Sequence, residues 1–169
     1  SRGYTKKGRR VYILGENGLI EEMQANGIDA VGCDYFGHAE IQEIAIPEDI
    51  TACVVAFDRT LTYRKLAIGT RVIVENDALF VGTNCDAVLP LGNGVFAPDC
   101  LPNIVALQEA TGRKAVILGK PNRSMFEPLQ TLKGINPKET LMVGDRLNTD
   151  ILFSKNIGSM GALVLTGVT

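Results

Sequence analysis

Charged side chains follow several apolar runs of the 169-residue sequence, at the points where buried strands would end. Asp58 follows the run ACVVAF, Lys120 follows AVILG, Asp145 follows LMVG, and Asp150 lies one turn into the next segment. Polar residues at the carboxyl ends of parallel strands face the ligand crevice of an open α/β sheet. Two carboxylates and a lysine there could hold Mg²⁺ and a phosphate group. Each residue alone could be a solvated charge, but their recurrence at successive strand ends favours the phosphate and magnesium hypothesis.

The segments that would position these residues alternate between short apolar runs and amphipathic stretches. Strands are expected at residues 11–15, 29–33, 52–57, 79–83, 115–119, 140–144 and 162–166, and helices at 16–26, 62–74, 101–111, 124–133 and 149–157. Asn148 or Thr149 is the expected cap of the last helix, and residues 86–99 are predicted to form a loop or loose hairpin. The continuous apolar strands predict the α/β class, with a doubly wound parallel sheet.

The composition excludes several function classes. Hydrophobic residues make up 46% of the chain, charged residues 21%, and the net charge is −2, which is ordinary globular usage. We therefore expect no nucleic-acid partner and no membrane, since no apolar run approaches the ~20 residues of a membrane span. The basic N-terminus has no apolar stretch of the secretory type behind it, so a cytoplasmic protein is expected. One histidine and four separated cysteines argue against a zinc site.

Two motifs make the sequence similar to a known family. Gly119-Lys120-Pro121-Asn122 and, further on, the segment from Met142 to Ile151 (MVGDRLNTDI) resemble the haloacid dehalogenase-like phosphatases. The resemblance is strongest to the phosphoglycolate and p-nitrophenyl phosphatase branch, which carries a large α/β cap. It extends upstream through residues 81–94, 57–66 and 15–18, and so covers nearly the whole chain.

The resemblance implies that the chain comprises parts of two domains. Residues 1–96 would be the cap domain, and residues 97–169 would be the C-terminal half of a Rossmann-like core, with the boundary near the Gly- and Pro-rich stretch 91–98. In this family Lys120 matches the lysine that holds the nucleophile and the substrate phosphate. Asp145 matches the ligand of Mg²⁺, the expected cofactor, and Asp150 matches the supporting carboxylate.

The resemblance also implies a substrate. Asn84, Asp86, Leu89 and Pro90 match the cap loop that faces the substrate, which would be a small phosphorylated metabolite. The pyridoxal-phosphate phosphatases carry a histidine where this chain has Leu89, so leucine favours the phosphoglycolate-like members. Caps of this branch often mediate homodimers, which makes a homodimer through the cap an expected assembly.

The chain departs from the family in one large respect. The family's nucleophile is the first aspartate of an Asp-x-Asp-Gly motif that precedes the cap, and these 169 residues contain no such motif. We therefore expect this chain alone to be inactive, with a poorly ligated metal site and Asp145 paired to Lys120 instead. Two alternatives stay open. One is a capless phosphatase in which Asp58 is the nucleophile, although Thr60 stands where the general acid belongs. The other is a non-catalytic, cap-derived binding or dimerisation module.

Overall fold

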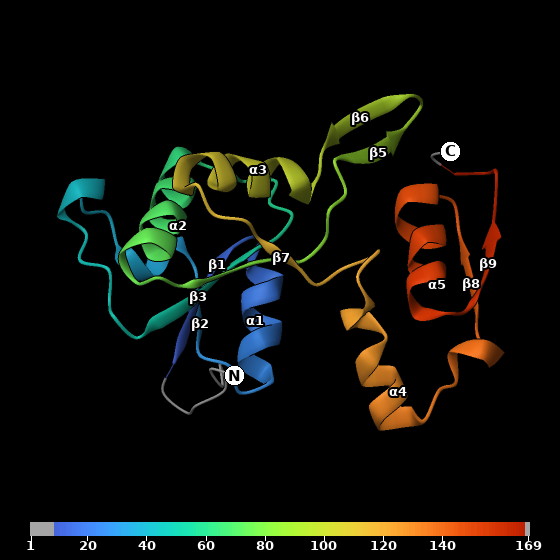
Figure 1. Cartoon of the computed structure of the whole chain (residues 1–169). Coiled ribbons are helices and arrows are strands. Elements are labelled where there is room, and N and C mark those ends of the chain that lie inside the picture. Colours follow the sequence, from blue (N-terminus) through green and yellow to red (C-terminus); the bar gives the residue numbers. More distant parts are fainter. Residues whose placement is uncertain (1–8, 168–169) are drawn as a thin grey trace. The chain divides into compact units, whose positions relative to one another are not determined.

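The computed structural model describes residues 9–167, which form two compact units. The first unit comprises residues 9–89 and 97–116, and the second comprises residues 90–96 and 117–167 (Figure 1). Within residues 9–167, no helix is both long and apolar enough to cross a membrane.

A five-stranded sheet forms the centre of the first unit. Its strands are β1 (Arg10–Leu14), β2 (Ala30–Val31), β3 (Ile50–Val55), β4 (Leu79–Gly82) and β7 (Val116–Ile117), in the order β2-β1-β3-β4-β7. β1 pairs in parallel with both β2 and β3, and β3 pairs in parallel with β4. The parallel α/β fold expected from the continuous apolar runs is therefore confirmed.

Helices cover both faces of this sheet. α1 (Asn17–Ala25) packs beside β2, whereas α2 (Tyr63–Glu75) and α3 (Cys100–Thr111) pack together against β1, β3 and β4 (Figure 1). Thr62 caps α2 by accepting the amide N–H of Lys65 at 3.2 Å. The core between these layers includes Tyr12, Ile68 and Leu107, which are fully buried. Two short 3₁₀ turns, η1 (Cys33–Phe36) and η2 (Ile41–Glu43), follow β2.

The division between the units differs from the boundary expected near residue 96. Residues 97–116, assigned from the sequence to the second part, belong to the first unit. The reason is α3, whose buried side chains Cys100, Asn103, Ile104 and Leu107 pack on the layer formed by α2 and the sheet. Gly112, with a positive φ of 66°, ends this helix as the sequence predicted.

The Gly- and Pro-rich stretch is a β-hairpin of β5 (Val88–Gly92) and β6 (Val95–Pro98). Asn93 and Gly94 form its tip with φ angles of 52° and 74°. Two successive positive φ angles are typical of the turn that joins antiparallel strands most tightly, and an Asn-Gly pair adopts them at little cost. Of the loop or loose hairpin expected from the sequence, the structure shows the hairpin.

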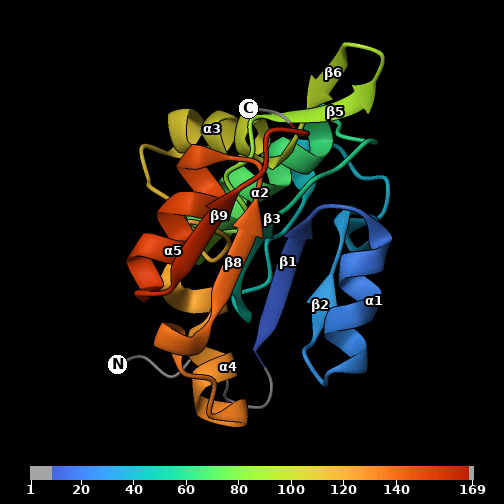
Figure 2. The ribbon, with the colours of Figure 1, turned by 90° about the vertical axis from the view of Figure 1, so that its right-hand side faces the viewer.

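The second unit contains a parallel pair of strands and three helical segments (Figure 2). β8 (Leu141–Gly144) pairs with β9 (Met160–Leu163), and the helical segments are α4 (Glu127–Lys133), the π-helical turn η5 (Leu147–Ile151) and α5 (Leu152–Ile157). Two short 3₁₀ turns, η3 (Arg123–Met125) and η4 (Pro137–Glu139), complete it. Phe126, Phe153 and Ile157 form its small core, with Met142 packed against them.

Candidate functional site

Lys120 lies on a short loop after β7 that is tied down at both ends. The side-chain amide of Asn122 donates to the carbonyl of Ile117 at 2.8 Å, and that of Asn156 on α5 donates to the carbonyl of Pro121 at 2.7 Å. These two hydrogen bonds hold the backbone around Lys120 against the rest of the second unit. The role of Asn156 could not be predicted from the sequence, because an asparagine on a helix carries no signal of the loop it will contact.

Asp150 is delivered by the π-helical turn η5, directly after β8. The amide N–H groups of Asp150 and Ile151 both donate to the carbonyl of Arg146, at 3.0 and 3.1 Å. Such widened turns occur frequently at functional sites, because they redirect a side chain within a helix. The expected cap at Asn148 or Thr149 was wrong: the helical segment begins at Leu147, with Arg146 in the capping position.

The carboxylate of Asp150 joins the lysine loop to the end of β8. Lys120 Nζ lies 2.5 Å from Asp150 Oδ1, while Asp150 Oδ2 accepts the amide N–H groups of Asp145 at 3.1 Å and Arg146 at 3.2 Å. This contact corrects the sequence-based expectation for Lys120, since the ion pair seen is with Asp150 rather than with Asp145. The π turn at Leu147–Ile151 brings Asp150 back to the strand end, where its Oδ2 accepts the amides of Asp145 and Arg146.

The charge state of Asp150 follows from these contacts. The residue is only 3% exposed, and burial raises the pKa of its carboxyl group. The hydrogen bond from Lys120 and those from the amides of Arg146 and Asp145 act in the opposite direction and outweigh burial, so the pKa lies below its ordinary value. Asp150 is therefore an anion at neutral pH that fixes the lysine and the backbone at the strand end.

Glycines make room for both carboxylates. A Cβ on Gly144 would overlap the side chain of Asp150, and one on Gly167 would overlap that of Asp145. Neither glycine has a positive φ, so close approach rather than backbone conformation requires them. The strand end and residue 167 thus form a cradle around the two aspartates.

The residues at this position could supply part of the ligand set of a magnesium site. Asp145 follows β8, is partly exposed and offers a carboxylate, which is the hard oxygen donor that Mg²⁺ prefers. Asp150 has both oxygens engaged by Lys120 and backbone amides, so it orients its neighbours. Within residues 9–167 there is no cluster of three or more His, Cys, Asp or Glu side chains that could hold a metal. Asp145 can therefore contribute one ligand, and the remaining ligands would be water, substrate or residues outside the described part.

The predicted substrate residues lie elsewhere in the chain. Asn84 follows β4, and its side-chain oxygen accepts the amide N–H of Asp86 at 3.4 Å. Leu89 is partly buried and Pro90 is exposed, both on β5. Asn84, Asp86 and Leu89 belong to the first unit, whereas Lys120, Asp145 and Asp150 come together in the second. Their assignment to substrate binding stays a prediction.

Asp58 has a local structural role. Its side chain is fully buried, and Oδ1 accepts the amide and the hydroxyl of Thr60, each at 2.8 Å. Oδ2 accepts Lys65 Nζ at 2.7 Å. With both oxygens occupied and no exposed surface on its side chain, Asp58 cannot reach a phosphate ester in this conformation, which speaks against the capless alternative.

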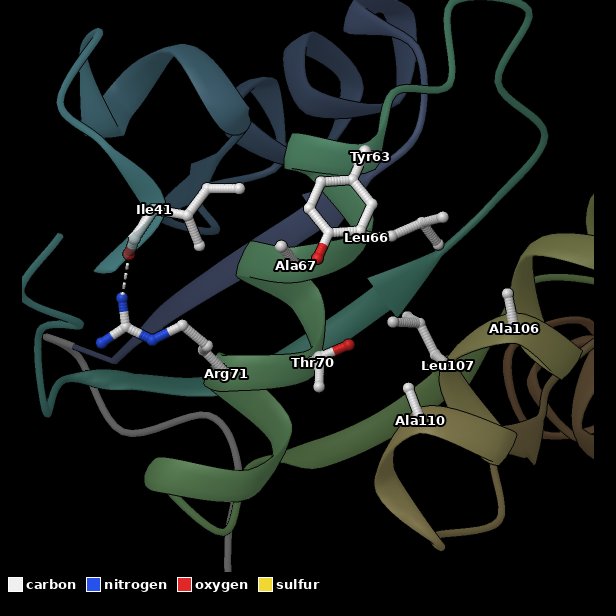
Figure 3. A pocket seen from close by; sticks show the side chains of 9 residues that line it. All are labelled: Ile41, Tyr63, Leu66, Ala67, Thr70, Arg71, Ala106, Leu107 and Ala110. Carbon is white, nitrogen blue, oxygen red and sulfur yellow. Dashed lines mark hydrogen bonds between the residues drawn. The ribbon is translucent and has the colours of Figure 1, made fainter. Parts of the chain in front are cut away.

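A cavity of about 370 Å³ in the first unit is apolar and carries no catalytic groups (Figure 3). Its walls come from α2, α3 and Ile41, with Tyr63, Leu66 and Ala67 on one side and Ala106 and Ala110 on the other (Figure 3). The Arg71 guanidinium at its edge donates to the carbonyl of Ile41 at 2.6 Å. The lining suits an apolar contact and offers nothing that could act on a phosphate.

The geometry at Lys120 and Asp150 coincides with a match to a known family. Residues 117–169 match the HAD-hydrolase-like family model. This part of the chain is thus similar to the haloacid dehalogenase-like hydrolases, and the relatives that match nearly the whole chain are phosphatases.

Two relatives show how far the similarity extends. The chain is 39% identical over 165 residues to the glycerol-3-phosphate phosphatase of Rattus norvegicus, covering 95% of this chain and 51% of that protein. It is 37% identical over 169 residues to the chloroplastic phosphoglycolate phosphatase 1A of Arabidopsis thaliana, covering 96% of this chain and 47% of that protein. The chain thus spans about half the length of these relatives.

Solved structures confirm the fold. The p-nitrophenyl phosphatase of Archaeoglobus fulgidus aligns with a TM-score of 0.78 at 29% identity, over 97% of this chain and 57% of that one. The glycerol phosphate phosphatase of Mycobacterium tuberculosis, in complex with magnesium, aligns with a TM-score of 0.79 at 29% identity, over 99% of this chain and 46% of that one. The resemblance to phosphoglycolate and p-nitrophenyl phosphatases inferred from the two motifs is therefore confirmed.

Proposed function

We propose that this chain forms the phosphate-holding part of a Mg²⁺-dependent phosphomonoesterase that hydrolyses a small phosphate ester. The observation that carries the proposal is the contact of Lys120 Nζ with the buried carboxylate of Asp150, at the carboxyl end of β8. A lysine fixed in this way presents a positioned cation to a phosphoryl group. Positioned cations stabilise the negative charge that develops on a transferring phosphoryl group, and they need no reorganisation at the moment of reaction.

The roles of the three residues follow from their contacts. Lys120 Nζ has three N–H donors and donates one to Asp150 Oδ1, and in the proposed role it also donates to a phosphate oxygen. Asp150 holds the lysine and, through Oδ2, the amide N–H groups of Asp145 and Arg146. Asp145 would hold Mg²⁺ through its carboxylate. A bound Mg²⁺ supplies charge neutralisation at the phosphoryl oxygens.

The nucleophile is proposed to be an aspartate outside these 169 residues. Its attack on phosphorus breaks the P–O bond to the alcohol, which leaves with a proton, and water then hydrolyses the aspartyl-phosphate to release inorganic phosphate. Support comes from the sequence, which contains no Asp-x-Asp-Gly, and from the contacts of Asp58, which engage both of its carboxylate oxygens. On this proposal, the chain alone has no turnover.

The proposed substrate is a small, anionic phosphate ester of the kind that the relatives' names describe, glycerol 3-phosphate or phosphoglycolate. Asn84, Asp86, Leu89 and Pro90 would contact the part of the substrate that leaves with its oxygen. Leucine at position 89 favours these small esters over pyridoxal phosphate, a preference of modest size because one loop residue rarely decides specificity.

The second candidate function is a binding or dimerisation module. The apolar cavity between α2 and α3 favours it, because an apolar surface depression is a common feature of protein interfaces (Figure 3). The two candidates differ in one property: a module needs neither Lys120 nor Asp150 for its role.

The test is an assay of two proteins with Mg²⁺ present, the 169-residue chain and the same chain extended by the segment that precedes Ser1 in its reading frame. Glycerol 3-phosphate, phosphoglycolate, pyridoxal phosphate and p-nitrophenyl phosphate serve as substrates. We expect hydrolysis only by the extended protein, with the first two substrates preferred. Hydrolysis of none of the four by the extended protein would overturn the proposal.

A further inference from the structure

A polar cavity of about 340 Å³ lies in the first unit, at the carboxyl ends of β1, β2 and β3. Its side chains are Asn17, Ile20, Cys33, Asp34, Thr60 and Lys65, and the backbone of two glycines completes it. Its volume is at the lower end of the range of about 300–1,000 Å³ that is typical of small-molecule sites. All of its residues belong to the first unit, and none of them has a role in the proposed phosphatase chemistry.

The position of this cavity is the topological switch point of the sheet. β2 and β3 pair with opposite edges of β1, so the connections that follow β1 and β3 leave in opposite directions. α1 lies on one face of the sheet and α2 on the other (Figure 1), and the cavity lies beyond the ends of β1 and β3. In open α/β sheets, ligands bind in that crevice.

Among the described residues that line the cavity, the one cation, Lys65, is already paired. Lys65 Nζ donates to Asp58 Oδ2 at 2.7 Å and to Thr60 Oγ1 at 2.9 Å, and Asp58 compensates its charge. Glu16, at the entrance to α1, is likewise paired with Arg59 at 2.6 Å. The remaining ionised group in the lining is Asp34, which is exposed and forms no ion pair with any residue from 9 to 167. A ligand that donates hydrogen bonds from neutral hydroxyl groups fits this balance better than a phosphate.

The lining also offers an amide and one apolar side chain. Asn17 is exposed at the first position of α1, and in the described part of the chain its side-chain amide has no hydrogen-bond partner. Ile20 lies one turn further along the same helix and supplies an apolar wall. A nucleoside needs three kinds of contact. A carboxylate can accept hydrogen bonds from the sugar hydroxyl groups, an amide can bind the edge of the base, and an apolar side chain can pack against the ring.

One feature of a known way of binding ribose recurs here, the spacing of an acidic residue after the first strand. Gly15 and Gly18 lie in the turn between β1 and α1, and Asp34 follows β2, about 20 residues after Gly15. In dinucleotide-binding folds, an acidic residue at this position accepts hydrogen bonds from ribose hydroxyl groups. Asn17 and Ile20 stand where the second and third glycines of the dinucleotide fingerprint belong, which disfavours the close backbone approach that a bound phosphate needs in this turn.

We propose that this cavity is a binding site for a ribonucleoside, with the carboxylate of Asp34 accepting hydrogen bonds from the ribose hydroxyl groups and Asn17 contacting the base. The site goes beyond the proposed phosphatase function, because recognition rests on the sugar hydroxyl groups and a phosphate adds nothing to it. Nucleoside and nucleotide share the ribose, and the compensated charges of Lys65 and Glu16 select the uncharged nucleoside.

The test is a titration of the ¹⁵N-labelled 169-residue chain with adenosine, uridine, 2′,3′-dideoxyadenosine and AMP, followed by amide chemical shifts. We expect saturable shifts at Asn17, Gly18 and Asp34 with at least one of the two ribonucleosides. We expect dideoxyadenosine to bind about tenfold more weakly than adenosine or worse, because a site built for hydroxyl groups rejects an analogue that lacks them. AMP should bind no more tightly than adenosine.

The variant Asp34→Asn should lose this discrimination between adenosine and its dideoxy analogue. Glu21→Gln, which neutralises an exposed carboxylate of α1 outside the cavity, should keep it. Three results would overturn the proposal: no saturable shift with either ribonucleoside, equal binding of the dideoxy analogue, or shifts with AMP alone that are centred on Lys120. Because both variants replace exposed side chains, a retained amide spectrum will show that they fold.

Discussion

Lys120 Nζ lies 2.5 Å from Oδ1 of Asp150, a carboxylate that is 3% exposed and whose second oxygen accepts two backbone amides from the end of β8. One side chain therefore fixes a lysine from one loop and the backbone of another. Both oxygens of Asp150 are used in this way, so Asp150 positions its neighbours, and in the proposed function Asp145 contributes its carboxylate to the metal. The site therefore holds the lysine ammonium in a fixed position from which it can bind a phosphate group.

Replacing Asp150 with alanine should release the amides of Asp145 and Arg146. Both N–H groups donate to Asp150 Oδ2, so in the parent chain they should exchange slowly with solvent deuterium. The variant loses the acceptor and leaves the Lys120 ammonium without its ion-pair partner, which should cost about 2–4 kcal/mol, because Asp150 is buried and Lys120 partly exposed. Hydrogen exchange of the two amides measures the change, and Glu127→Ala, an exposed residue of α4, is the control. Unchanged protection in Asp150→Ala would contradict the account of this network.

Replacing Gly144 with alanine should destabilise the second unit through crowding alone. The new Cβ would overlap the side chain of Asp150, and overpacking of this kind costs about 1–3 kcal/mol. Hydrogen exchange of the β8 amides measures the loss. The matched control is Gly18→Ala on α1, where a Cβ meets nothing within 4 Å and the change should be neutral or stabilising by up to about 1 kcal/mol. An equal effect at both positions would contradict the close approach of Gly144 and Asp150.

Much of the fold could be predicted because its signals are local. The apolar run ACVVAF becomes β3, and the helix stops at Gly112, Gly134 and Gly158 all adopt the left-handed conformation that ends a helix. The membership of α3 in the first unit could not be predicted, because it depends on which surface the buried face of α3 meets. A Gly- and Pro-rich stretch marks a change of chain direction, which in this chain is the hairpin of β5 and β6.

The residues of the candidate site could be predicted from the sequence, but the interactions between them could not. The strand ends identify Lys120 and Asp145, although the strands before them, β7 and β8, belong to different sheets and not to one edge as the sequence suggested. The pairing of Lys120 with Asp150 depends on the π-helical turn at Leu147–Ile151, and residue types do not reveal a widened turn. Asp58 shows the opposite case. Its position at a strand end suggested a catalytic role, but both of its carboxylate oxygens accept hydrogen bonds from the neighbouring residues Thr60 and Lys65.

Replacing Lys65 with methionine should destabilise the first unit, because it leaves the carboxylate of Asp58 buried without its counter-charge. The Asp58 side chain is fully buried and that of Lys65 is 18% exposed, so the expected loss is about 3–5 kcal/mol. Urea unfolding followed by tyrosine fluorescence reports on this unit, which contains Tyr12, Tyr35 and Tyr63. The exposed Lys114→Met is the control. The double variant Asp58→Asn with Lys65→Met should be more stable than Lys65→Met alone, and the reverse order would contradict a charge-pair role.

Calorimetric titration of the 169-residue chain with Mg²⁺ should show no saturable binding in the micromolar range. Asp145 supplies one carboxylate, Asp150 is engaged, and Mg²⁺ gives up its water shell reluctantly. Saturable micromolar binding that Asp145→Asn abolishes would mean that the chain itself holds a complete metal site, which contradicts a nucleophile and further ligands outside these residues.

The central claim is that Lys120, Asp150 and Asp145 form the phosphate and metal side of a phosphatase site. It is tested most directly by measuring kcat of Asp145→Asn and Lys120→Met in the protein extended upstream of Ser1, with Mg²⁺ and glycerol 3-phosphate or phosphoglycolate. Both changes remove charge, and Asp145→Asn leaves the side-chain volume almost unchanged, so we expect a native circular dichroism spectrum with kcat lowered by at least about 10²–10³-fold. The exposed Glu139→Gln serves as the control and should keep the parent kcat. Parent-like kcat in either Asp145→Asn or Lys120→Met would contradict the claim.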